Sequence, residues 1–225
     1  MQPVRTQFTR ELVALTQDLT QMCRLAHDAA ERVTHALADA DLTATYEVFA
    51  LDEQLQKMYA ACEARTVVLL ALQAPVARDL RHVVTAIQIA GELSRIGRLT
   101  SGVADQVYRA HPEHVAAGPV AATIGAMGRL ATERTAIAVE GVANGRPATD
   151  HAAAVTAMRA LHGQLRTELA GAADRPVGAA IDLALLGHNL ERCVDHTGRI
   201  DRLIRFLETG VPPTAQGEPG DTPGE

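Results

Sequence analysis

Residues 4–38 contain neither glycine nor proline, and this uninterrupted stretch constrains the fold more than any other feature of the sequence. Its apolar positions recur every three or four residues, the period that keeps side chains on one face of a helix. Because a helix of this length needs something to cover its apolar face, the stretch predicts long helices packed against one another. The apolar positions are Phe8, Leu12, Leu15, Leu19, Met22, Ala26, Ala29, Val33 and Ala36.

The composition agrees with an all-α fold. Hydrophobic residues make up 47% of the chain, yet aromatic residues only 3%, and tryptophan is absent. The apolar residues are mainly Ala, Leu and Val, mixed with Arg, Glu and Gln, as is typical of helices. A β-sandwich or a β-barrel would need more aromatic and β-branched residues.

The turn signals predict six long helices in two groups of three. After residues 4–38, we expect a second helix over about 42–73 and a third from Pro75 to about 110. A fourth runs from the Gly118-Pro119 pair to about 144, a fifth follows the turn at 144–147 and ends at about 171, and a sixth ends at about 209. Asp174 is the expected N-cap of the last helix, with Pro176 in its first turn. We therefore expect one three-helix unit over residues 1–111, a second over 112–209, and a disordered tail rich in Pro, Gly and acidic residues over 210–225.

Charge and hydropathy narrow the function classes. The net charge of −6 and the pI of about 5.8 argue against a nucleic-acid-binding protein. The strongest apolar stretch, Thr66 to Ala77, is much shorter than the ~20 residues of a membrane-spanning helix. The N-terminal residues show no apolar signal-peptide region, and we expect a cytoplasmic protein that meets a membrane only through partners. The three cysteines, expected as core residues, are Cys23, Cys62 and Cys193.

The third helix of each group carries the same pattern. The segment 92–98 (Glu-Leu-Ser-Arg-Ile-Gly-Arg) aligns with 189–195 (Asn-Leu-Glu-Arg-Cys-Val-Asp), about 97 residues later, with Leu and Arg in common. The first segment is preceded by Arg-Asp-Leu-Arg at 78–81, and the second continues to His196. These segments resemble the repeats of the PhoU family of phosphate-uptake regulators, whose signature reads Leu-Glu-Arg-Ile-Gly-Asp-His. The resemblance covers nearly the whole chain except the tail.

The resemblance implies a fold and a role. The fold is a tandem repeat of two three-helix bundles. The role is that of a phosphate-transport accessory protein, without enzymatic activity, which negatively regulates phosphate uptake and the phosphate regulon. Its implied partners are the ATPase subunit of a phosphate ABC transporter and a sensor histidine kinase. Many family members also bind iron or zinc through pairs of acidic residues, one pair in each repeat.

Metal binding can be tested against the residues of the last helix. Glu191 and Asp195 are four residues apart, so their side chains project from the same face, and a cation would relieve their repulsion. His188 could add a nitrogen ligand, which makes iron or zinc (or magnesium or manganese) the expected metal of this second repeat. Alternatively, Asp195 pairs with Arg192 and Arg199 in an ordinary ladder of salt bridges.

The first repeat departs from the family pattern. Where the acidic pair should stand, the sequence has Ser94 and Arg98, and a guanidinium cannot bind a metal ion. Asp52 and Glu53 resemble supporting acidic positions of the family, but without the main pair we expect them to be solvated charges. If the chain binds a metal ion, the candidate site is therefore in the second repeat only.

A second group of residues recurs in the family's repeats and is a candidate contact for acidic groups of a partner protein. The alternative is salt bridging between helices of the bundle itself, with the arginine stems covering apolar surface. This group consists of Arg78, Asp79, Arg81, Arg95 and Arg192.

Other functions find little support in the sequence. Neither an HExxH motif nor a GxSxG elbow is present, so we expect no enzyme. The alternative function is a metal-binding helical-bundle protein, with iron or zinc, that has another signalling or enzymatic role. We also expect a homodimer, for which the charge-poor stretch Ala116 to Ala126 could supply a face.

Overall fold

The protein is a bundle of six long helices, shown here as a computed structural model that describes residues 2–73, 78–171 and 175–215. All of its regular structure in that part of the chain is helical, as predicted. The elements are α1 (Gln2–Asp39), α2 (Leu42–Gln73), α3 (Arg78–Ala110), α4 (Gly118–Asn144), α5 (His151–Ala170), α6 (Val177–Thr209) and the short 3₁₀ helix η1 (Pro213–Ala215).

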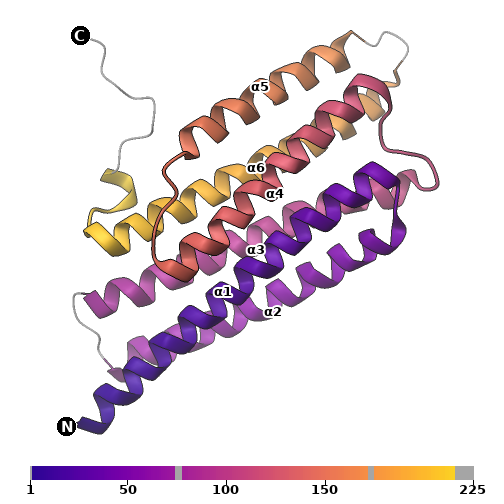
Figure 1. Cartoon of the computed structure of the whole chain (residues 1–225). Helices are drawn as coiled ribbons and strands as arrows, with labels where there is room; N and C mark the ends of the chain where they lie inside the picture. Colours follow the sequence, from indigo (N-terminus) through magenta and orange to yellow (C-terminus); the bar gives the residue numbers. More distant parts are fainter. Residues whose placement is uncertain (1, 74–77, 172–174, 216–225) are drawn as a thin grey trace, which may run out of the picture.

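The helices form two layers (Figure 1). One layer contains α2, α3, α6 and α5, in that order, and the other contains α1 and α4 side by side. Helix α1 packs on α2 and α3, and α4 packs on α5 and α6, so the helices fall into the predicted groups of three. The groups meet where α1 contacts α4 and where α3 contacts α6. The main core cluster runs through both groups, and the domain boundary at residues 111 and 112 stays a prediction.

The predicted core positions are confirmed by burial. In α1, every predicted apolar position is buried except Leu12, which is half-buried. The three cysteines are buried too, and burial raises the pKa of Cys23 to about 12, of Cys62 to about 11 and of Cys193 to about 12. Within the described residues, no helix is long and apolar enough to cross a bilayer.

Helix ends agree with the turn signals in most places. Between α1 and α2, the Asp41 carboxylate accepts a hydrogen bond of 2.7 Å from the backbone N–H of Thr43, which caps α2. The expected start of α6 is wrong by two residues, because Pro176 is the N-cap rather than part of the first turn and the helix begins at Val177. The predicted start of the third helix at Pro75, the Asp174 cap and residues 216–225 of the predicted tail lie outside the described residues.

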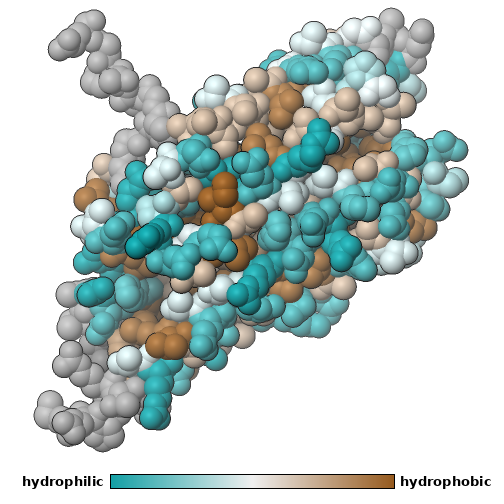
Figure 2. All heavy atoms as spheres, viewed as in Figure 1, coloured by the Kyte–Doolittle hydropathy of each residue, from teal (hydrophilic) through white to brown (hydrophobic). Residues whose placement is uncertain are grey.

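The charge-poor stretch Ala116 to Ala126 is partly buried within the chain. Val120, Thr123 and Ile124 are buried, because α4 packs against three other helices. The outer face over α1 and α4 is mostly hydrophilic, while paler, more apolar residues gather along the edge that α5 forms (Figure 2). The apolar surface available for a second copy in this stretch is therefore smaller than the sequence suggested.

A buried ion pair joins α4 to α6. The Arg134 guanidinium, 1% exposed, lies with Nη2 3.4 Å from the Asp201 carboxylate, which is 5% exposed. Asp201 also accepts a hydrogen bond from the backbone N–H of Ala148, and Arg134 reaches Asp150 at the start of α5 at 2.6 Å. Burial raises the pKa of Asp201, and although the Ala148 N–H and Arg134 lower it, the net shift is upward. This cluster fixes the C-terminal half of α6 relative to α4 and α5.

We expect Asp201→Ala to lower the free energy of unfolding by about 3 kcal/mol, because it leaves the buried Arg134 without one of its carboxylates. The double variant Arg134→Met with Asp201→Leu should lose less unfolding free energy than the sum of the losses in the two single variants. Urea denaturation measures both, with the exposed Arg129→Met on α4 as the control. Additive losses in the double variant would show that the two residues are not coupled.

A second prediction concerns the packing of α5 on α6. A Cβ atom at Gly187 would overlap the side chain of the fully buried Leu165. We therefore expect Gly187→Ala to destabilise the protein by about 1–3 kcal/mol in thermal or urea unfolding. Gly178→Ala in the same helix is the matched control, since nothing lies within 4 Å of its new methyl group. Equal effects of the two substitutions would contradict close packing at Gly187.

Candidate functional site

Four charged side chains meet where α3 crosses α6. The helices are antiparallel, as shown by contacts of Arg81 with Phe206 and of Glu92 with His196. Glu92 is almost fully buried, and its carboxylate lies 2.5 Å from His196 Nδ1 and 3.6 Å from Arg199 Nη1. Arg95 reaches the other carboxylate oxygen at 2.6 Å. One acid is thus surrounded by an imidazole and two guanidinium groups.

The charge balance at Glu92 favours its ionised form. Burial by itself raises the pKa of this carboxyl group. The hydrogen bond from His196 and the positive charges of His196, Arg95 and Arg199 outweigh burial, so that the net pKa lies below its ordinary value. The arrangement can hold the two halves of the chain together, and it exposes cationic groups of Arg95 and Arg199 at the surface of the α2–α3–α6–α5 layer.

Glu191, the first predicted metal ligand, pairs with a histidine of a neighbouring helix. Its carboxylate lies 2.6 Å from Nδ1 of His162 on α5 and 3.9 Å from Nδ1 of His188. The structure therefore brings His188 and Glu191 together, as the sequence suggested, and adds His162. Two imidazoles beside one carboxylate resemble part of a metal-binding donor set.

Asp195, the other predicted acidic ligand, has a different partner. Its carboxylate accepts a hydrogen bond of 3.1 Å from Arg192 Nη1, three residues earlier on α6. Across the described ranges, no group of three or more His, Cys, Asp or Glu residues is arranged to hold a metal ion. As placed, the residues do not complete a coordination sphere, and a metal in the second repeat stays a prediction.

In the first repeat, the corresponding positions form a network without a metal-binding pair. Ser94 Oγ donates to Gln56 Oε1 at 2.7 Å, and Arg98 Nε donates to the same oxygen at 3.2 Å. The Gln56 amide group in turn donates to Asp52 at 2.7 Å. Glu53 is a solvated charge, as expected, and pairs with Lys57, whereas Asp52 is half-buried and hydrogen-bonded. The residues that replace the family's acidic pair therefore link α3 to α2.

Three of the five partner-binding candidates make contacts within the chain. Arg95 pairs with Glu92 and Arg192 with Asp195. Arg81 donates to the backbone oxygen of Phe206 at 3.4 Å, with its guanidinium group 5.6 Å from the centre of that ring. Arg81 also lies against Gly210, whose left-handed backbone (φ 77°) ends α6. A guanidinium at this position complements the negative end of the helix dipole.

The other two candidates are exposed at the start of α3. Arg78 and Asp79 are neighbours in its first turn, and within the described residues no ion pair ties either of them to another helix. Arg78 also lines a cavity of about 440 Å³ at the junction of α1, α3, α4 and α6. His82 lines the same cavity, and its pKa is lowered by burial and by the charge of Arg78. Arg78 and Asp79 are therefore accessible to a partner protein.

The pairings of His162 with Glu191 and of His196 with Glu92 were not predicted from the sequence. Both histidines lie on helical faces that also carry core residues, and the partners are 29 and 104 residues away. The one signal was the position of His196 at the end of the family's signature segment. Sequence alone does not show which distant acid such a histidine meets.

We expect protein purified without added metal to contain less than one equivalent of iron or zinc, because His162 and Arg192 already pair with the carboxylates of Glu191 and Asp195. Elemental analysis measures this. One bound equivalent that is lost in Glu191→Ala/Asp195→Ala would contradict the expectation and establish the metal site. The exposed acids Glu133 and Asp182, changed to Ala, provide the matched control.

Comparison with known proteins identifies the family. A PhoU domain matches residues 19–107. The chain is 38% identical to "phosphate-specific transport system accessory protein PhoU homolog 1" of Mycobacterium leprae, over 96% of this chain and 99% of that protein. It is also 38% identical to PhoU homolog 2 of Mycobacterium tuberculosis (strain H37Rv), over 93% of this chain and 100% of that protein.

Solved structures show the same fold. The PhoU structure from Streptococcus pneumoniae superposes with a TM-score of 0.78 at 22% identity, covering 90% of this chain and 97% of that one. The PhoU structure from Pseudomonas aeruginosa superposes with a TM-score of 0.71 at 23% identity, covering 90% of this chain and 99% of that one. Matched by whole-length relatives in sequence and by helical bundles in fold, the chain belongs to the PhoU family of phosphate-transport accessory proteins.

Proposed function

We propose that this protein holds down phosphate uptake and the phosphate-starvation response when phosphate is abundant. It would do so on the cytoplasmic side of the membrane, by docking onto the ATPase subunit of a phosphate importer and onto a sensor histidine kinase. The observation that carries the proposal is the whole-length match to accessory proteins of the phosphate-specific transport system. Docking lowers a partner's activity if the adaptor binds the partner's inactive state more tightly than its active state.

The paired side chains support an adaptor rather than an enzyme. At the α3–α6 crossing, Glu92 is ionised and enclosed by cations, an arrangement that stabilises a scaffold. Arg78 and Asp79, which make no ion pair among the described residues, are exposed in the first turn of α3 at one end of the layer. We assign to them a contact with a charged surface of a partner.

A second candidate function is a metal-binding helical-bundle protein with another signalling or enzymatic role. The observation in its favour is the closeness of His162 and His188 to Glu191. A rearrangement that frees Asp195 from Arg192 would be needed to add a second carboxylate.

We expect deletion of the gene to raise phosphate uptake and phosphate-responsive transcription in phosphate-rich medium. Because M. tuberculosis H37Rv has both a homolog 1 and a homolog 2, the test strain should lack any paralogue. Radiolabelled phosphate uptake and a transcriptional reporter are the measurements. If neither rises in that strain, the proposed function is wrong.

The same strain tests the docking residues. We expect the variant Arg78→Glu/Asp79→Lys, which keeps the net charge, to fail to restore low uptake, because it reverses the local charge pattern at the start of α3. Arg129→Glu/Glu133→Lys, an exposed charge exchange on α4, is the matched control and should restore it. Full restoration by both variants would show that the start of α3 is not a contact.

A further inference from the structure

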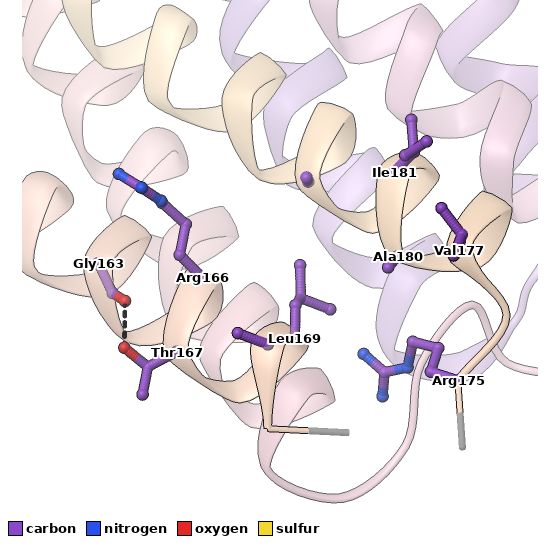
Figure 3. Close-up of a pocket in the computed structure, with 10 residues that line it drawn as sticks. Gly163, Arg166, Thr167, Leu169, Arg175, Val177, Ala180 and Ile181 are labelled. Carbon is purple, nitrogen blue, oxygen red and sulfur yellow. Dashed lines mark hydrogen bonds between the residues drawn. The ribbon is translucent and has the colours of Figure 1, made fainter. Parts of the chain in front are cut away.

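A groove lies between the end of α5 and the start of α6, away from the residues discussed so far (Figure 3). Its volume is about 780 Å³, within the range of ligand-binding clefts. Leu169 from α5 and Val177, Ala180 and Ile181 from α6 face the gap, and the Arg175 side chain lies between the helix ends. The groove is thus apolar along its length and cationic at its edge.

The α6 wall of the groove exposes an unusual amount of apolar surface. Val177, Ile181 and Leu185 are 76%, 54% and 52% exposed, although each is a large aliphatic residue. They stand at positions i, i+4 and i+8, so they form one stripe about 12 Å long on the helix. Contiguous exposed apolar surface of this kind marks interaction sites on folded proteins. The stripe matches the spacing of apolar residues on an amphipathic helix.

The charged residues that line the groove, among those that the structure describes, are both arginines. Arg166 and Arg175 line it, and no acidic residue is among the described residues that do. Glu168, on the same helix, is turned toward α4, where it accepts a hydrogen bond from Thr123. Arg175 Nη1 is buried without a hydrogen-bond partner among the described residues, an arrangement that an incoming acceptor would satisfy.

The start of α6 adds to the positive potential. Its N-cap residue, Pro176, makes no side-chain cap, and the first turn contains no acidic residue. Among the described residues, no side chain accepts a hydrogen bond from the first backbone N–H groups of the helix, and the positive end of the helix dipole points at the groove edge. Carboxylates placed here would be stabilised both by these N–H groups and by the two arginines.

These charges argue against a second copy of the chain as the occupant. In a two-fold symmetric dimer each patch meets a copy of itself, which would bring together two patches that both carry arginines. The tail of this chain is also a poor fit: residues 216–225 span at most about 36 Å, whereas Ile181 lies about 42 Å along α6 from Thr209. The occupant must carry negative charge and apolar residues at helical spacing.

We propose that the α5–α6 groove binds an acidic amphipathic helix of a partner protein. The apolar side of that helix lies on Val177 and Ile181, and its carboxylates lie beside Arg166, Arg175 and the start of α6. This is the helix-in-groove mode of recognition, with specificity supplied by charge.

The test uses the full-length protein and two synthetic helices as probes. Both carry the same stripe of leucines; one has glutamates along its flanks and the other has lysines. Fluorescence anisotropy should show binding of the acidic helix, weakened by salt, and at least about tenfold weaker binding of the basic one. Because the assay contains no phosphate importer or kinase, its result is independent of the proposed function.

Variants locate the binding on the groove. Ile181→Ser and Arg166→Glu should each weaken binding of the acidic helix by about tenfold or more, and Arg166→Glu should improve binding of the basic helix. Val13→Ser, an equally exposed aliphatic position on α1, and Arg24→Glu, an exposed arginine of α1, are the matched controls and should change nothing.

Three outcomes would overturn the proposal. The first is equal binding of the acidic and basic helices, and the second is unchanged binding in Ile181→Ser. The third comes from sedimentation of the protein alone: a dimer that Ile181→Ser dissociates would show that the groove joins two copies of this chain. Circular dichroism of each variant establishes that the exposed substitutions leave the fold intact.

Discussion

The antiparallel contact between α3 and α6 is the constraint on which the arrangement of the molecule depends. Without this contact, the layer of α2, α3, α6 and α5 would divide into two separate pairs of helices. The Glu92 carboxylate would then lie beside apolar side chains without its partners on α6. In the contact, Glu92 meets His196 and Arg199 of the other group, and the cost of burying its carboxylate is offset by opposite charges. The same contact ends at Arg81, which packs on Phe206 and Gly210.

Much of this fold follows from the sequence, because its elements are long and their signals agree. The helix predicted over 42–73 is found at Leu42–Gln73, since Asp41 caps its start and neither glycine nor proline interrupts it. In α6, the apolar residues that recur every three or four positions are buried from Leu183 to Ile204. Local patterns of this kind need no knowledge of what lies opposite.

The candidate sites were harder to predict, because they depend on pairs far apart in the chain. Arg134 reads as an ordinary surface arginine of a helix, yet it is fully buried against Asp201, 67 residues later. The sequence shows that Ser94 and Arg98 depart from the family's acidic pair. It does not show that Gln56 links both residues to α2. The two repeats have therefore diverged: hydrogen bonds occupy the first site, and a histidine–glutamate pair with a separate salt bridge occupies the second.

The length of α6 has a consequence for how an adaptor of this shape can work. The helix has 33 residues, so its two ends are about 50 Å apart. The exposed turn with Arg78 and Asp79 lies at the end where Arg81 caps α6, and the α5–α6 groove lies at the opposite end. Segments of two proteins bound at these two proposed sites would contact the bundle about 50 Å apart, so that occupation of one site leaves the other exposed.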